Sequence, residues 1–268
     1  MTRAVAGVAV AAVALTGSVH VLRLVDRSRV AHFSDGRTGP RVLVTDVRVP
    51  ATGRRPFPLI VFAHGFALLP STYARLLEAW TRAGYVVAAP VFPVESATAP
   101  GGPSESDLLN EPADIRFVIT RLLVTLRGVV DPRRIAVAGQ SDGGVAALAV
   151  AYDRRYRDHR IDAAAILSGA PPLGWAAAPR GSPPLLAVQG TADPINPPAT
   201  ASFYFPRMRR PKYLVWLLGA AHLPPYTEDD RWERAVARTT VAFFDRYLRG
   251  TRAKVVAVPG VTRLVAAP

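Results

Sequence analysis

Three residues of the chain, Ser141, Asp193 and His222, have the types and the chain order needed for nucleophilic catalysis by a serine. A serine hydroxyl is a poor nucleophile until a base takes its proton, and that base must be oriented by a third group. The order serine, acid, histidine is one of the known chain orders of such a triad. We therefore assign Ser141 as the candidate nucleophile, His222 as the candidate base and Asp193 as the group that orients the imidazole.

Ser141 stands in the segment Gly139-Gln140-Ser141-Asp142-Gly143, between an apolar run and an alanine-rich run. Glycines two positions before and two positions after the serine allow a sharp, strained turn and close packing of a strand against a helix. Such a turn exposes the hydroxyl above the sheet and points the N–H groups of a helix N-terminus at it. Because a bare G-x-S-x-G often occurs by chance, the prediction depends on the strand expected at residues 134–138 and the helix expected at residues 143–152.

Asp193 and His222 each follow a predicted strand at its carboxyl end. Asp193 lies in a turn-rich loop after strand 184–188, and His222 follows strand 213–218. In a parallel sheet both loops open on the edge that carries the serine turn, where the active sites of open α/β sheets lie. Taken singly, Asp193 could be a turn former before Pro194, and His222 could be a surface-loop histidine without function. Their common edge favours the triad.

An oxyanion hole is expected from two backbone N–H groups, those of Phe66 and Asp142. The segment His64-Gly65-Phe66 directly follows a buried strand, where one N–H can face the serine turn. Losing such a donor typically costs about 3 kcal/mol of transition-state stabilisation. We interpret His64 as a support of this loop and not as a second base, because it stands before Gly65. The side chain of Asp142 is expected to point away from the nucleophile.

The remaining pattern alternates strands and helices. We expect strands at 42–49, 59–63, 85–89, 134–138, 163–167, 184–188 and 213–218, and helices at 71–83, 108–126, 143–152, 199–205 and 232–248. This order predicts an α/β fold with a mostly parallel central sheet and helices on both faces. The first strand alternates apolar and polar residues, which is typical of an antiparallel strand near an edge.

The connection between the strands at 163–167 and 184–188 is short, which predicts an open site without a large cap domain. Leu173 and Trp175 in this connection are candidates for the substrate pocket. Trp175 could equally be an ordinary core residue.

With these motifs the chain resembles serine esterases of the α/β-hydrolase superfamily, particularly chlorophyllases and the cutinase-like and platelet-activating-factor acetylhydrolase-like hydrolases of bacteria. The resemblance is carried by the motifs at residues 64–66, 110–116 and 139–144 together with Asp193 and His222, and it covers about residues 41–249. It implies hydrolysis of a small-molecule, lipid or polymeric carboxylic ester through an acyl-enzyme intermediate, without a metal or cofactor. Two alternatives stay open: an acyltransferase with the same triad, and a non-catalytic envelope binding protein on the same fold.

The net charge of +13 comes almost entirely from arginine, since only Lys212 and Lys254 are lysines. No recognition-helix motif or aromatic-interleaved basic groove accompanies the charge, so we expect no nucleic-acid partner. A weak attraction to an anionic envelope or lipid surface is the better interpretation. The absence of cysteine excludes disulfides and thiolate metal sites. The sequence does not predict an oligomeric state.

The N-terminus has an uninterrupted run of apolar residues and glycine at residues 4–15. This length fits the apolar region of a signal peptide, whereas a membrane anchor needs about 20 apolar residues. An ordinary N-terminal helix packed on the domain is the alternative. We therefore expect an exported protein, secreted or membrane-anchored at the cell envelope. Its expected segments are a signal peptide or membrane anchor at 1–25, a linker at 26–40, an α/β-hydrolase domain at 41–250 and a C-terminal tail at 251–268.

Overall fold

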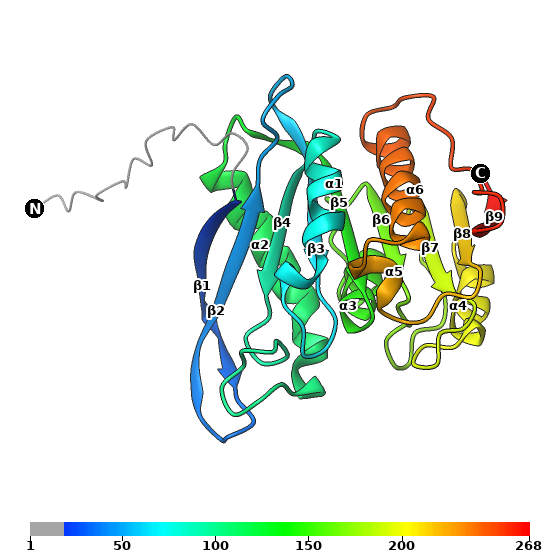
Figure 1. The fold of residues 1–268 in the computed structure, drawn as a ribbon. Helices are drawn as coiled ribbons and strands as arrows, with labels where there is room; N and C mark the ends of the chain where they lie inside the picture. The colour runs from blue at the N-terminus through cyan, green and yellow to red at the C-terminus, as the bar shows by residue number, and fades with distance from the viewer. Residues whose placement is uncertain (1–18) are drawn as a thin grey trace, which may run out of the picture.

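The structure of the chain, a computed structural model, describes residues 19–268. Within these residues the chain forms one nine-stranded sheet in the order β1-β2-β4-β3-β5-β6-β7-β8-β9 (Figure 1). The six strands from β4 to β8 in this order pair in parallel, whereas β1, β2 and β9 pair antiparallel at the two sides. The strands are Val19–His32 (β1), Thr38–Arg48 (β2), Phe57–Ala63 (β3), Val86–Val91 (β4), Val130–Gln140 (β5), Ala163–Leu167 (β6), Leu185–Gly190 (β7), Lys212–Leu217 (β8) and Thr262–Ala267 (β9).

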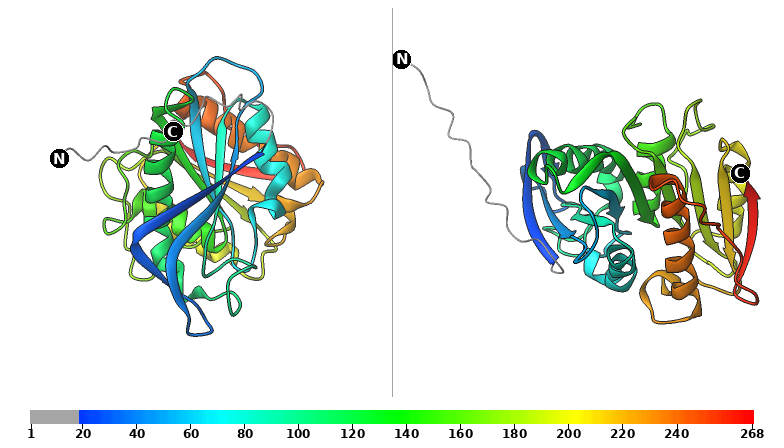
Figure 2. Two further views of the ribbon diagram at one scale, coloured as in Figure 1. Left: turned by 90° about the vertical axis from the view of Figure 1, so that its left-hand side faces the viewer. Right: turned by 90° about the horizontal axis from the view of Figure 1, so that it is seen from above.

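Helices cover both faces of the sheet (Figures 1 and 2). They are α1 (Ala74–Arg82), α2 (Glu111–Thr125), α3 (Asp142–Tyr152), α4 (Pro198–Tyr204), α5 (Pro224–Thr227) and α6 (Arg231–Leu248), with 3₁₀ turns η1 (Pro70–Tyr73), η2 (Glu105–Asn110) and η3 (Phe205–Arg207). One apolar core lies under α2, α3 and α4, and a second lies under α1, α5 and α6. The predicted α/β architecture with a mostly parallel sheet is therefore confirmed.

Strand β3 shows how the sequence produces the two cores. All seven of its residues are buried. Leu59 and Val61 belong to the core under α2 and α3, whereas Ile60 and Phe62 belong to the core under α1 and α6. Because successive side chains of a strand point to opposite faces, a strand covered on both faces must be apolar throughout. This is why the sequence of this strand is a continuous apolar run.

The prediction of a linker at residues 26–40 is wrong, because these residues belong to strands β1 and β2. Strand β1 pairs antiparallel with β2 from Val19 opposite Arg48 to His32 opposite Thr38. The two strands are joined by a short turn at residues 33–37. Charged residues at 26, 27 and 29 conceal the strand in the sequence, since its edge position leaves one side in contact with solvent. The strand also takes in residues 19–25, which we expected in the leader or anchor; residues 1–18 lie outside the described residues.

The C-terminal tail expected at residues 251–268 is also part of the sheet. Strand β9 pairs antiparallel with β8, from Thr262 opposite Leu217 to Ala267 opposite Lys212. The hydrolase domain therefore runs from β1 to β9 and not from residue 41 to residue 250. Between β6 and β7 the chain forms no helix, and the fold has no large cap domain. Within residues 19–268, none of the helices combines the length and the apolarity that a membrane span requires.

Candidate active site

The structure brings Ser141, His222 and Asp193 into one hydrogen-bonded chain. His222 Nε2 lies 2.8 Å from Ser141 Oγ, and His222 Nδ1 lies 2.8 Å from Asp193 Oδ2. Ser141 follows β5, Asp193 follows β7 and His222 follows β8, all at the carboxyl edge of the parallel strands. Asp193 is 3% exposed, while Ser141 and His222 are partly exposed. The serine hydroxyl can donate to Nε2 while Nδ1–H donates to the carboxylate, which is the arrangement a base and its orienting acid require.

The turn at Ser141 is strained, and its flanking glycines are sterically required. Ser141 has φ 55° and ψ −121°, a conformation that costs a non-glycine residue about 1–3 kcal/mol. A Cβ atom at Gly139 would lie 2.0 Å from the carbonyl oxygen of Gly143, and one at Gly143 would lie 2.2 Å from that of Ala63. Only glycine fits where strand, turn and helix approach so closely. The spacing of the motif is therefore explained by the packing of β3, β5 and α3.

The loop after β3 passes directly against this turn. A Cβ atom at Gly65 would lie 3.2 Å from Ser141 Cβ. Among residues 19–268, the N–H of Phe66 donates to no other group. The N–H of Asp142, at the first position of α3, has no partner within the helix. Their assignment as oxyanion-hole donors stays a prediction.

Asp193 is held by donors that the sequence analysis did not identify. Its Oδ1 accepts from the backbone N–H groups of Ile195 and Asn196, each at 2.9 Å. Its Oδ2 accepts from Gln189 Nε2 at 3.0 Å in addition to His222. These donors stabilise the ionised carboxylate, which is the form that can stabilise a charged imidazole. A polar glutamine at the end of the buried strand β7 was the signal that could have identified Gln189.

Gln140 and Tyr73 connect the two sides of the site, and the sequence analysis assigned neither of them. The Tyr73 hydroxyl donates to Gln140 Oε1 at 2.7 Å and accepts from the N–H of Gly65 at 3.1 Å. Gln140 Nε2 donates to the backbone oxygen of His222 at 3.2 Å. Burial raises the pKa of Tyr73, so its hydroxyl keeps the proton that it donates. The loop after β3 and the loop that carries the base are therefore joined through two buried side chains.

The structure does not place Leu173 and Trp175 beside the nucleophile. Trp175 Nε1 donates to the backbone oxygen of Tyr152 at 3.2 Å, at the far end of α3 from Ser141. A helix of 11 residues separates the two positions by about 15 Å. Trp175 is instead an ordinary core residue, the alternative that the sequence left open, because its indole is buried in the core. Leu173 is 93% exposed and contacts Arg155, also beyond the end of α3. The prediction that Leu173 and Trp175 line a substrate pocket beside Ser141 is therefore wrong.

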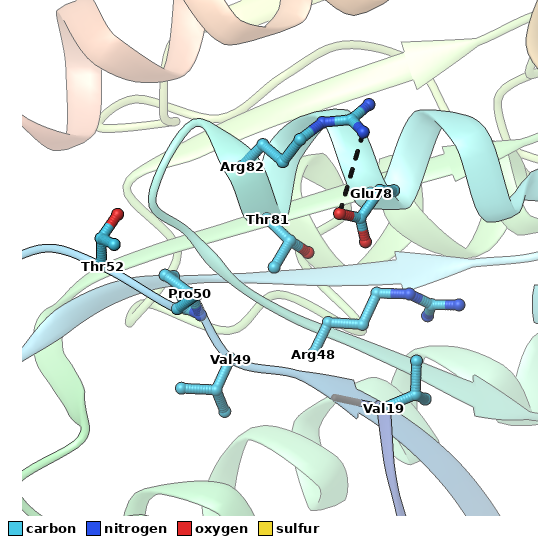
Figure 3. Close-up of a pocket in the computed structure, with 9 residues that line it drawn as sticks. Val19, Arg48, Val49, Pro50, Thr52, Glu78, Thr81 and Arg82 are labelled. Carbon is cyan, nitrogen blue, oxygen red and sulfur yellow. Dashed lines mark ion pairs between the residues drawn. The ribbon is translucent and has the colours of Figure 1, made fainter. Parts of the chain in front are cut away.

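A cavity of about 160 Å³ lies between α1 and the end of β2 (Figure 3). Arg48, Glu78 and Arg82 are among its lining residues. Arg48 pairs with Val87 at the start of β4, so this cavity opens at the amino edge of the parallel strands. It is on the opposite edge of the sheet from Ser141 and is unrelated to the triad.

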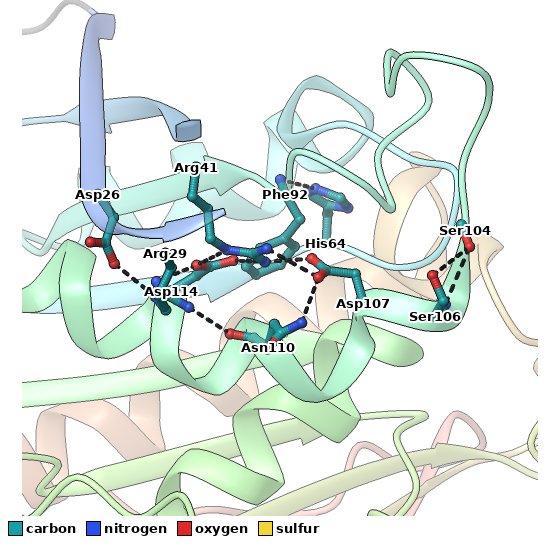
Figure 4. Close-up of polar contacts among 10 residues, drawn as sticks. All are labelled: Asp26, Arg29, Arg41, His64, Phe92, Ser104, Ser106, Asp107, Asn110 and Asp114. Carbon is teal, nitrogen blue, oxygen red and sulfur yellow. Dashed lines mark hydrogen bonds and ion pairs between the residues drawn. The ribbon is translucent and has the colours of Figure 1, made fainter. Parts of the chain in front are cut away.

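His64 supports the loop after β3, as its sequence position predicted. Its Nε2 accepts from the N–H of Phe92 at 3.1 Å (Figure 4). Its Nδ1 lies 2.9 Å from the oxygen of Gly65. Complete burial lowers the pKa of His64 to about 4, so the ring is neutral near pH 7. With both nitrogens occupied by backbone groups, His64 connects the ends of β3 and β4 and cannot serve as a second base.

The fold and the family match define an esterase-like hydrolase of the α/β-hydrolase superfamily. In the solved structures, a ferulic acid esterase from Streptomyces cinnamoneus is similar, with a TM-score of 0.71 and 24% sequence identity over 94% of this chain and 96% of that chain. A family model for chlorophyllase matches residues 11–200. The chain therefore belongs to the chlorophyllase family, which confirms the predicted class of carboxylic ester hydrolase. No curated protein matches the chain.

Proposed function

We propose that the chain hydrolyses carboxylic esters through a Ser141-His222-Asp193 triad and an acyl-enzyme intermediate. The observation that carries this proposal is the unbroken chain of two 2.8 Å contacts from Ser141 Oγ through the His222 ring to Asp193. The strained turn supports it, because strain of this kind persists where the surrounding packing holds a functional residue in place.

In the first half of the reaction, Ser141 Oγ attacks the ester carbonyl carbon while His222 Nε2 takes the hydroxyl proton. The resulting oxyanion accepts hydrogen bonds from the N–H groups of Phe66 and Asp142. His222 then donates its proton to the departing alkoxide, and the alcohol leaves an acyl-serine. In the second half, water attacks the acyl carbon while His222 takes its proton, and His222 then returns that proton to Ser141 Oγ as the carboxylic acid leaves.

The site is open enough to admit esters of different sizes. Ser141 and His222 are partly exposed, and no cap domain covers them. Phe66 is 37% exposed on the oxyanion loop, and Ile195 is 65% exposed on the loop of the acid. These apolar side chains offer a surface on either side of the triad for an acyl or alcohol group. Small-molecule, lipid and polymeric esters can all reach such a site.

The test is turnover of a short-chain chromogenic ester by the wild type and by Ser141→Ala. We expect the alanine variant to lose at least about 10⁴-fold in kcat. Ser71→Ala is the matched control, since Ser71 is an exposed serine at η1, and it should retain wild-type turnover. Comparable activity in Ser141→Ala would exclude the triad. Product analysis in the presence of a competing alcohol separates hydrolysis from acyl transfer, and esters of graded acyl length define the substrate.

We also propose that the protein is exported, on the basis of the apolar run at residues 4–15. Because residues 19–25 form the first half of β1 in the sheet, we place the leader or anchor before Val19. The prediction is tested by mapping the mature N-terminus and the compartment of the native protein. A full-length chain recovered from the cytosol would contradict it.

A further inference from the structure

Three acidic side chains converge beside the turn of Ser141. They are Glu95 in the connection after β4, Glu111 at the start of α2 and Asp142 at the start of α3. Glu95 and Glu111 are both completely buried, at 0% exposure. The carboxyl groups of these two residues lie within hydrogen-bonding reach of each other, and that of Glu95 also reaches Asp142.

The Glu95 and Glu111 carboxyl groups lack the partners that a buried negative charge requires. None of their four oxygens receives a hydrogen bond from an N–H group or a hydroxyl of residues 19–268. An isolated carboxylate in such surroundings takes up a proton instead of staying charged. Burial raises the pKa of Glu95 to about 8 and that of Glu111 well above its usual value. The contact between them raises the pKa of Glu111 further and lowers that of Glu95, because Glu111 is the donor. At neutral pH both are therefore neutral acids.

The protons of these two acids can form a directed chain. Glu111 donates to Glu95, and Glu95 donates to the Asp142 carboxylate. In this arrangement the three side chains carry one negative charge and not three. The proton of Glu111 satisfies one oxygen of Glu95, and a neutral carboxyl group costs much less to bury than an ionised one.

Glu95 contacts both segments that hold the proposed oxyanion donors. Its backbone oxygen accepts from the N–H of Ala67 at 3.0 Å, one residue after Phe66, and Ala67 has a φ of 55°. Its side chain reaches Asp142, the residue after Ser141. The two segments that hold the proposed oxyanion donors therefore meet at Glu95.

We propose that Glu95, as a neutral acid, is a positioning residue that joins the two halves of the oxyanion hole and adds no second negative charge to that of Asp142 beside the tetrahedral intermediate. The proposal rests on the proposed ester hydrolysis. Glu95 acts through the backbone of Phe66 and Asp142 and does not contact the substrate. Loss of its proton to solvent would add a negative charge beside the oxyanion and would weaken the transition state selectively.

The other charged groups around Glu95 and Glu111 do not neutralise them. Glu95 faces Glu111 on α2, Asp142 on α3 and, at longer range, Glu105 on η2. Glu111 additionally faces Asp107 and Asp114, whose charges are paired with Arg41 of β2 (Figure 4). His64, which packs against Phe92 in the same region, is neutral. Asp142 and Glu105 thus favour the protonated form of Glu95, and Asp107 and Asp114 favour that of Glu111.

The test measures kcat and KM from pH 6 to pH 10 for the wild type and for Glu95→Gln, which is isosteric and always neutral. We expect the wild type to lose about tenfold in kcat with an apparent pKa of about 8, with KM unchanged. Glu95→Gln should keep its kcat up to pH 10, and Glu95→Leu, which cannot bond to Asp142, should be slow at every pH. Asp229→Asn is the control, since it removes an exposed acid that is not among the groups facing Glu95, and it should follow the wild-type profile.

Superimposable profiles for the wild type and Glu95→Gln, in an enzyme whose turnover depends on Ser141, would overturn this inference and leave the proposed function intact. Unfolding in urea provides a readout that does not need turnover. The folded-state pKa of Glu95 is raised above its ordinary value of 4.5. The protonated side chain therefore favours the folded state most below pH 4.5, and this contribution to stability is lost as the pH rises to about 8. Wild-type stability should therefore fall relative to Glu95→Gln between pH 5 and pH 8. A constant difference between the two proteins would show that Glu95 is ionised throughout.

Discussion

Two buried carboxyl groups on either side of Ser141, those of Asp193 and Glu95, have opposite surroundings. Asp193 is 3% exposed, and both of its oxygens accept hydrogen bonds, from two backbone N–H groups, Gln189 and His222. Glu95 is 0% exposed, and neither of its oxygens has a donor other than a carboxyl proton. The same chemical group at equal depth is therefore held as an anion on one side of the nucleophile and as a neutral acid on the other.

The difference separates two tasks in ester hydrolysis. The base side must stabilise a positive imidazolium, and a negative Asp193 held by fixed donors does this. The oxyanion side must stabilise a negative oxygen, and there an ionised Glu95 would oppose the reaction. The number of donors around each carboxyl group thus decides its charge, and the charge decides which side of the reaction it can assist.

The largest effect is expected on the base side, from Asp193→Asn. The asparagine cannot accept from His222 Nδ1–H on a nitrogen, so the ring loses its orientation and its counter-charge. We expect kcat to fall by about 10³- to 10⁴-fold with little change in folding. Steady-state kinetics with a chromogenic ester and a thermal unfolding curve measure both. Asp229→Asn, at an exposed acid, is the control. A loss below tenfold would mean that the donors around Asp193 have only a structural role.

The buried carboxyl group of Asp114 is stabilised in a third way, by the guanidinium group of an arginine. Backbone N–H groups stabilise Asp193, and a carboxyl proton neutralises Glu95. Arg41 is 1% exposed and binds both Asp107 and Asp114 (Figure 4). We expect Arg41→Met to lower the free energy of unfolding by about 3–4 kcal/mol, because two buried acids lose their cation. Chemical denaturation measures this loss. Arg37→Met is the matched control, since its ion pair with Asp35 is exposed and screened by solvent and should contribute far less. Equal effects would show that burial does not strengthen the Arg41 pairs.

The sequence predicted the parts of the fold that are buried on both faces. Strands such as Leu185–Gly190 are wholly buried, so their apolar runs are recognisable without knowledge of the partners. Strands β1 and β9 lie at the two edges of the sheet and are partly exposed, and charged residues interrupt their pattern. An edge strand is defined by the strand it pairs with, which local sequence does not show.

The triad was predictable for a similar reason. Each of Ser141, Asp193 and His222 follows a parallel strand at its carboxyl end, and these ends lie at one edge of the sheet. The position of each residue along the chain was therefore enough to predict that the three lie close together. The links through Tyr73, Gln140 and Glu95 depend on side-chain directions across separate elements. Tyr73 and Gln140, for example, are 67 positions apart in the chain. No spacing rule connects such residues, and only the packed structure brings them together.

The smallest effect is expected where the two sides of the site are joined, at Gln140. Gln140→Leu keeps most of the volume but removes the donor to the His222 backbone oxygen and the acceptor for Tyr73. Because Asp193 still orients the ring, we expect kcat to fall by only about tenfold, the equivalent of one or two neutral hydrogen bonds. Tyr73→Phe removes the other half of the link and is the matched partner for a double-mutant cycle. If the double variant is no slower than either single variant, the two side chains act as one unit that holds the oxyanion loop against the base. If the two losses in kcat multiply, Gln140 and Tyr73 act independently. The base side with Asp193 and the oxyanion side with Glu95 are then positioned separately.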